Sequence, residues 1–189
     1  MGLTLPREDI LAGIELVRRL PFWLRRPLNL EQARMTLRER LERREASFLA
    51  LVRAAVYQVR ASPYRALLGH AGCQYGDLER LVRRDGVDAT LRELFAHGVY
   101  LTVDEFKGRR PVIRGNTTIA VDPGQLRNPT AARHVAVQSG GSRGPATPVP
   151  IDLAFLRDRA VNTLLALDAR GGSDWVILGV SVADRRRPA

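Results

Sequence analysis

The chain of 189 residues is poor in cysteine, lysine and aromatic side chains. Its single cysteine, Cys73, excludes an internal disulfide and a zinc site built from several cysteines. Aromatic residues make up only 6% of the sequence, too few to predict the stacking platforms that bind single-stranded nucleic acid. The sequence has no run of about 18 or more apolar residues, so it predicts no membrane-spanning segment.

The N-terminal segment lacks the clean apolar stretch of a signal peptide. Acidic and arginine side chains are interspersed with the apolar ones over residues 7–20, which argues against export. The sequence therefore predicts a cytoplasmic protein, and its apolar fraction of 45% is sufficient for a folded core.

The positive charge comes almost entirely from arginine. The formal net charge is +10, and Lys107 is the only lysine. Such a charge ordinarily suggests a nucleic acid or an anionic membrane as partner. Here the arginines are spread along the chain and often alternate with acids, as in RERLERRE, which argues against dedicated nucleic-acid binding.

The first third of the chain has helical periodicity. Apolar residues at helical spacing predict an amphipathic helix over residues 7–20, which Pro21 should end. A longer helix is expected from about residue 30 to residue 60, with Ser62 and Pro63 as its stop signal. A helical N-terminal region, residues 1–62, is therefore expected to precede the rest of the fold.

A cluster of large apolar side chains follows the first predicted helix. Phe22, Trp23 and Leu24 stand next to Arg25 and Arg26. Such a cluster fits an interfacial membrane anchor. The simpler interpretation, which we prefer from the sequence, is an apolar plug that covers the edge of a core.

Short helices and then a hairpin are expected in the middle of the chain. Asp77 and Asp88 are predicted as helix N-caps. Gly86 and Gly98 are predicted as the residues at which helices stop. Residues 111–121 predict two short strands joined at a Gly115-Asn116 turn.

The last third predicts a strand, a loop, a helix and a second strand. HVAVQ, which ends at Gln138, should be a strand that leads into a Gly/Ser-rich loop at residues 139–144. Asp152 should cap a helix that runs to about Asp168, and the apolar run from Trp175 predicts a buried strand.

This order of elements predicts an α/β fold, with a helical N-terminal region followed by part of a mixed sheet. Residues 63–189 would then form a partial nucleotide-binding subdomain around the Gly/Ser-rich loop. Because a sheet usually has more strands than these, we expect the chain to be an incomplete domain.

The Gly/Ser-rich loop invites comparison with a nucleophilic serine. Residues 140–144 match G-x-S-x-G, but that elbow needs a helix directly after the serine. The prolines that follow oppose such a helix, and all three histidines precede Ser142. The phosphate motif of P-loop NTPases is also excluded, because no lysine follows Gly144.

Phosphate binding of another kind fits better. Glycines allow backbone N–H groups to approach an anion, and serine hydroxyls donate further hydrogen bonds. A strand, S-G-G-S-x-G and a proline-rich exit resemble the loop of the adenylate-forming superfamily, which reads T-S-G-[GT]-[ST]-T-G-x-P. The matching residues are Ser139, Gly140, Gly141, Ser142 and Gly144. Gln138 and Arg143 depart from the pattern.

Further segments resemble the phenylacetate-CoA ligase branch of that superfamily over about residues 45–180. They are SPYRALL, DLERL and LTVDEF before the loop and TPVPID after it. The resemblance implies an incomplete N-terminal domain of an adenylate-forming enzyme, in which residues 139–144 bind ATP. Within this loop, Arg143 either adds a charged contact to phosphate or points to solvent.

The same resemblance implies the partners of the full reaction. In that family a carboxylic acid reacts with ATP, accompanied by Mg²⁺, with loss of pyrophosphate, and the acyl group then passes to coenzyme A or another thiol. The adenine, ribose and Mg²⁺ motifs and the catalytic lysine of the family have no counterpart here. Catalytic residues and metal ligands are therefore not assigned, and we expect this chain alone to be inactive.

A function of another class stays open. The chain could be a small arginine-rich binding or scaffolding module for nucleic acid or protein, without catalysis. In that case the Gly/Ser-rich loop is only a connector.

Overall fold

The computed structural model describes residues 7–126, 135–138, 148–172 and 175. This part is mostly helical and also contains two separate two-stranded antiparallel sheets. It is consistent with a helix-rich α/β class. The mixed sheet expected from the sequence is not formed by the described residues, because each strand pairs with its neighbour in the chain.

The first helix, α1 (Arg7–Leu24), is longer than expected. It continues through Pro21 instead of ending there, and the backbone N–H of Arg25 donates to the Pro21 carbonyl at 3.2 Å. The last turn is also fixed from outside, because the Trp23 indole donates to the Leu153 carbonyl at 3.1 Å. This distant contact favours the helix although proline supplies no N–H.

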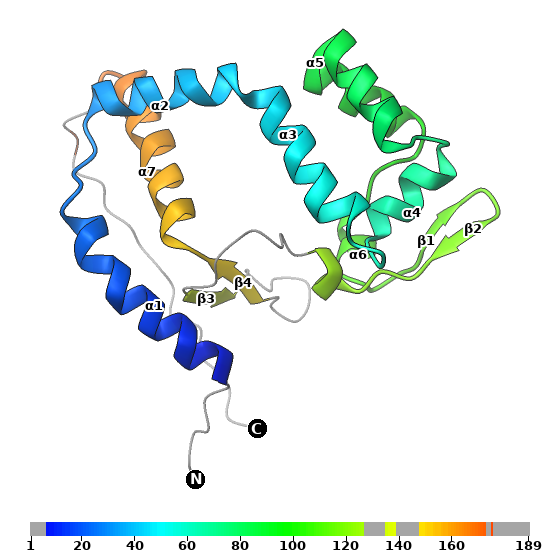
Figure 1. Cartoon of the computed structure of the whole chain (residues 1–189), viewed down its shortest axis with the longest axis horizontal. Helices are drawn as coiled ribbons and strands as arrows, with labels where there is room; N and C mark the ends of the chain where they lie inside the picture. The colour runs from blue at the N-terminus through cyan, green and yellow to red at the C-terminus, as the bar shows by residue number, and fades with distance from the viewer. Residues whose placement is uncertain (1–6, 127–134, 139–147, 173–174, 176–189) are drawn as a thin grey trace.

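The predicted long helix is divided into α2 (Leu30–Glu42), α3 (Arg44–Val52) and a π-helical turn (Arg53–Tyr57). The Asn29 side chain caps α2 by accepting from the backbone N–H of Gln32 at 2.8 Å. The break falls at Arg43, whose ψ of 7° departs from helical geometry. In Figure 1, α2 and α3 join two groups of elements across the top of the molecule.

One group contains α4 (Pro63–His70), α5 (Tyr75–Ala96) and α6 (Val103–Phe106). Gly86 and Gly98 have φ of 76° and 81°, which glycine adopts readily. Gly86 kinks α5 and Gly98 follows its end, so both predicted stops are confirmed as breaks in helical geometry.

The two predicted N-caps are wrong. Gln74 precedes α5, and Asp77 accepts from its backbone N–H at 2.9 Å from a position inside the helix. Asp88 lies within α5 and accepts from the Arg44 guanidinium at 2.6 and 2.8 Å. This partner holds the pKa of the Asp88 carboxyl below its usual value.

The core of this group lies between α3, α4 and α5. Its buried members are Leu49, Leu68, Cys73, Leu78, Val82, Val87 and Leu94. A hairpin of β1 (Val112–Arg114) and β2 (Thr117–Ile119) adjoins α4, and a 3₁₀ turn (Pro123–Leu126) follows. The predicted Gly115-Asn116 turn is confirmed.

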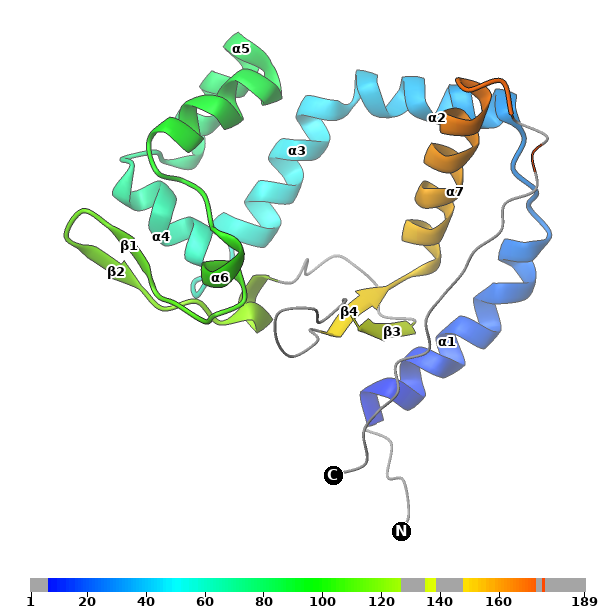
Figure 2. The ribbon, with the colours of Figure 1, turned by 180° about the vertical axis from the view of Figure 1, so that it is seen from behind.

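The other group combines both ends of the described chain. It holds α1, α2, the strands β3 (Val135–Gln138) and β4 (Pro148–Ile151), and α7 (Leu153–Asp168). Figure 2 shows α7 packed beside α2, where Arg34 contacts Asp168 at 2.7 Å and Arg40 contacts Asp158.

Only the first residue of the final predicted strand lies among the described residues. Trp175, its first residue, is exposed and in no strand, so it does not begin a buried strand as expected. The rest of that run, from residue 176 onward, lies outside the described residues.

Candidate phosphate loop and its framework

The strands β3 and β4 form a hairpin that frames the Gly/Ser-rich segment. Their Cα partners run from Val135 and Ile151 to Gln138 and Pro148. The described residues on either side of the segment 139–147 are therefore paired with each other. The predicted site residues Ser139, Gly140, Gly141, Ser142, Arg143 and Gly144 all lie outside the described residues.

The first described residues after this segment form a strand and not a helix. Prolines 148 and 150 lie in β4, and α7 begins only at Leu153. A nucleophile elbow and a P-loop NTPase motif both need a helix immediately after the loop. The order of β4 and α7 therefore argues against both, as the prolines did in the sequence.

The helix that follows the hairpin is capped as predicted. The Asp152 carboxylate accepts from the backbone N–H of Phe155 at 2.6 Å, and α7 ends at Asp168. An N-cap carboxylate satisfies one of the free N–H groups at the start of a helix. The residue directly after β4 thus fixes where α7 begins.

Contacts with α1, with Arg26 after it and with α2 hold α7 in place. The Trp23 indole bonds to the Leu153 carbonyl, and Arg157 donates to the Arg26 carbonyl at 3.1 Å. Arg34 adds the ion pair with Asp168 near the other end of α7. The base of the hairpin is therefore attached to a helix that is fixed at both ends.

The histidines that the structure describes take part in other contacts. His70 on α4 is hydrogen-bonded to the Thr117 hydroxyl at 3.0 Å, and His97 at the end of α5 contacts the Glu93 carbonyl at 2.8 Å. Neither belongs to the elements that frame the loop. Within the described ranges, no three His, Cys, Asp or Glu residues are placed to hold a metal ion, so ligands for Mg²⁺ are not identified there.

An apolar cavity of about 420 Å³ lies between α3, α4 and α5. It is lined by Phe48, Val52, Val56, Tyr64, Leu68, Leu78, Leu91, Leu94, Phe95, Val99, Tyr100 and Leu101. Burial raises the pKa of Tyr64, which favours its neutral hydroxyl. The cavity can accept an apolar group, but its lining offers no carboxylate, imidazole or thiol for catalysis.

A cluster of largely buried charged side chains was not predicted from the sequence. Arg114 on β1 contacts Glu105 on α6 at 2.9 Å, and the Glu105 carboxylate also accepts from the backbone N–H of Thr102 at 2.7 Å. These donors hold the pKa of Glu105 at about 2. The spacing T-x-x-E is the local signal of a capping box, but it does not reveal the arginine.

Neither protein-family models, curated proteins nor solved structures show a match to this chain. Within the described helices, none combines the length and the apolar character needed to cross a membrane. Any functional interpretation therefore depends on the residues of this chain and on the framework that surrounds them.

Proposed function

We propose that the β3–β4 hairpin carries the triphosphate-binding loop of an acyl-adenylate-forming ligase that resembles phenylacetate-CoA ligases. Residues 139–144 would contact the β and γ phosphates of ATP. The observation that carries this proposal is the pairing of Gln138 with Pro148, which closes a hairpin on either side of the Gly/Ser-rich segment.

The order of elements supports the same proposal. A strand, the Gly/Ser run, a proline-containing strand and the capped helix α7 follow one another. Backbone N–H groups and the hydroxyls of Ser139 and Ser142 can donate to phosphate oxygens, and Arg143 can add a charged donor. Such a loop positions and stabilises phosphate and makes no covalent bond.

The proposed role is phosphate binding without complete catalysis. In the full reaction a carboxylate oxygen attacks the α phosphorus of ATP, and pyrophosphate leaves. No residue of the described chain is positioned as the catalytic lysine of the family, since Lys107 follows α6 in the other group of elements. We expect this polypeptide to bind ATP and to show no carboxylate-dependent exchange of pyrophosphate into ATP.

Isothermal titration calorimetry tests the binding. We expect ATP and inorganic pyrophosphate to compete for one site, and AMP, which lacks the β and γ phosphates, to bind at least tenfold more weakly. The double variant Ser139→Ala/Ser142→Ala should lose about tenfold or more in ATP affinity, because hydrogen bonds to charged groups contribute about 1.5–3 kcal/mol. Ser47→Ala is the matched control, since Ser47 is exposed on α3 and far along the chain from the loop.

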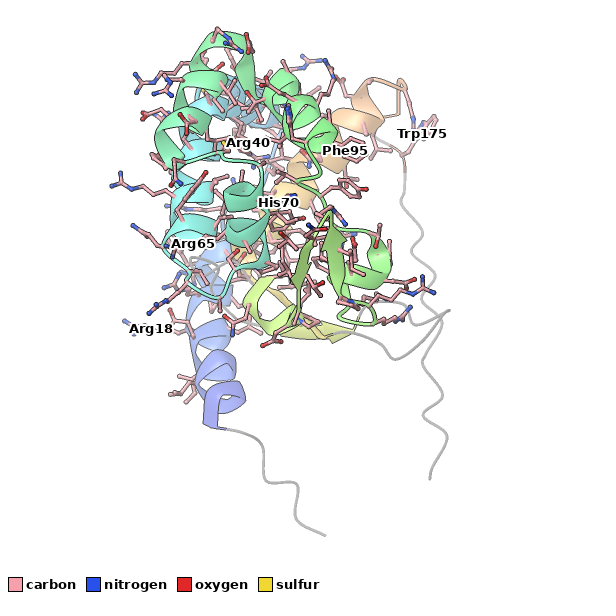
Figure 3. The ribbon with its side chains drawn as sticks, turned by 90° about the vertical axis from the view of Figure 1, so that its right-hand side faces the viewer. Arg18, Arg40, Arg65, His70, Phe95 and Trp175 are labelled. Carbon is pink, nitrogen blue, oxygen red and sulfur yellow. The ribbon has the colours of Figure 1, made fainter. Side chains whose placement is uncertain are left out.

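The contribution of Arg143 to ATP affinity can be separated from the effect of the net charge of the chain. Arg143→Ala should weaken ATP binding more than Arg65→Ala, which removes an exposed arginine of α4 that is labelled in Figure 3. Equal losses in both variants would show a nonspecific charge effect. Absence of ATP binding, together with DNA binding that weakens steeply with salt, would favour the arginine-rich binding module instead.

A further inference from the structure

The helix α1 exposes an apolar face that the described part of the fold leaves uncovered. Five large apolar side chains on it are between 60 and 71% exposed: Leu11, Ile14, Val17, Phe22 and Leu24. The opposite side carries the half-buried Leu16, Leu20 and Trp23, and α1 contacts α7 and β3. The expected plug over a core is therefore wrong for Phe22 and Leu24, because only Trp23 turns inward.

Arginines lie within this face and next to it. Arg18 lies between Ile14 and Leu11 around the helix axis at 100° per residue, and Figure 3 shows it pointing away from the rest of the molecule. Arg25 follows the end of α1. In the described part of the chain, neither of these two arginines has an acidic partner.

A third arginine contacts an aromatic ring of the apolar face. The Arg26 guanidinium lies 4.1 Å from the centre of the Phe22 ring. From Leu11 to Arg26 the sequence has four arginines and one acid, Glu15, which pairs with Arg19. The exposed face is therefore both apolar and cationic.

We propose that this face of α1 binds the surface of an anionic lipid bilayer, with the helix lying in the plane of the interface. Apolar side chains would enter the headgroup region, while the long arginine side chains reach lipid phosphates. The charge complementarity between cationic α1 and anionic headgroups selects this occupant. The N-terminal turns of α1 project beyond β3 and β4 in Figures 1 and 2.

A second copy of the chain is a less favourable partner for this face, because both copies carry the same positive charge there. A twofold contact centred on this face would bring the Arg18 side chains of the two copies close to each other. Like charges in a desolvated contact oppose association. An anionic lipid surface removes this repulsion, and the proposal does not depend on the phosphate loop.

Co-sedimentation of the full chain with vesicles tests the proposal. We expect the partition coefficient to be at least tenfold higher for vesicles with 30% phosphatidylserine in phosphatidylcholine than for phosphatidylcholine alone, and to fall as salt is raised. Ile14→Gln/Phe22→Gln should abolish most of this binding. Ile113→Gln/Phe95→Gln is the matched control, because these residues are 60 and 61% exposed, as are Ile14 and Phe22, but lie outside α1.

One further measurement makes the result independent of variant folding. In the wild-type chain, phosphatidylserine vesicles should slow hydrogen exchange of the amides in residues 11–24, and this protection should be absent with phosphatidylcholine. Equal binding to both vesicle types, or equal loss in the two double variants, would overturn the proposal. Dimerisation without lipid that Ile14→Gln/Phe22→Gln abolishes would identify a second copy as the occupant and would also overturn it.

Discussion

The guanidinium of Arg114 meets the carboxylate of Glu105 through two hydrogen bonds, at 2.9 and 3.3 Å, and both side chains are largely buried. Arg114 also donates to the carbonyls of Gly98 and Tyr100, and its guanidinium lies 4.3 Å from the Tyr100 ring centre. One side chain on β1 thus links α6 with the segment that follows α5. The pair therefore fixes the segment after α5, whose residues Val99 and Tyr100 line part of the apolar cavity.

Glu105→Gln should reduce the free energy of unfolding by about 2–3 kcal/mol, because it leaves a buried guanidinium without its charged partner. Urea denaturation measures the change as a lower midpoint at an unchanged slope. Glu79→Gln is the control. It breaks the exposed pair with Arg83 and should change stability by less than about 1 kcal/mol. Equal effects of the two substitutions would contradict the role given to Glu105.

The same pair predicts a pH dependence of stability. The pKa of Glu105 falls from 4.5 to about 2 in the folded chain, chiefly through its hydrogen bond with Arg114. A depressed pKa means that the stabilisation is complete above the unfolded value and is lost as the pH falls through the folded value.

The wild-type chain should therefore lose stability relative to Glu105→Gln as the pH falls from about 4.5 toward about 2. Urea midpoints for both chains, measured from about pH 7 to about pH 3, give this difference. A difference that stays constant over the range would show that the carboxylate charge is not the stabilising element.

Gly98→Ala should destabilise the chain by about 1–2 kcal/mol, because a side chain is disfavoured at a φ of 81°. The added Cβ would also lie 3.2 Å from Cδ of Arg114. Gly69→Ala is the matched control on α4, where a Cβ meets no atom within 4 Å. That substitution should leave stability unchanged or raise it by about 0.5 kcal/mol. Thermal unfolding distinguishes the two variants.

Features with local signals could be predicted from the sequence. Asp152 caps α7 because its side chain bonds three residues ahead, and Gly115-Asn116 forms a turn between neighbouring strands. The strand that ends at Gln138 was also predicted. Each of these depends on residues within a few positions of one another.

Features that depend on distant contacts could not be predicted. Pro21 remains inside α1, where Trp23 binds the carbonyl of Leu153 far along the chain. The pair of Arg114 and Glu105 joins two elements whose proximity no local pattern encodes. For the candidate phosphate loop, the sequence supplied the residues and the capped helix that follows them, and the structure added the pairing of β3 with β4.

Asp152→Ala tests whether that helix supports the loop. The substitution removes the acceptor for the Phe155 N–H and should cost about 1 kcal/mol in stability, whereas Asp152→Asn retains a capping oxygen and should cost less. If α7 fixes the base of the β3–β4 hairpin, Asp152→Ala should also weaken ATP binding several-fold under conditions where the chain stays folded, and Asp152→Asn should not. Calorimetric titration of both variants gives the comparison. Unchanged ATP affinity in a destabilised Asp152→Ala chain would show that the loop binds phosphate without support from α7.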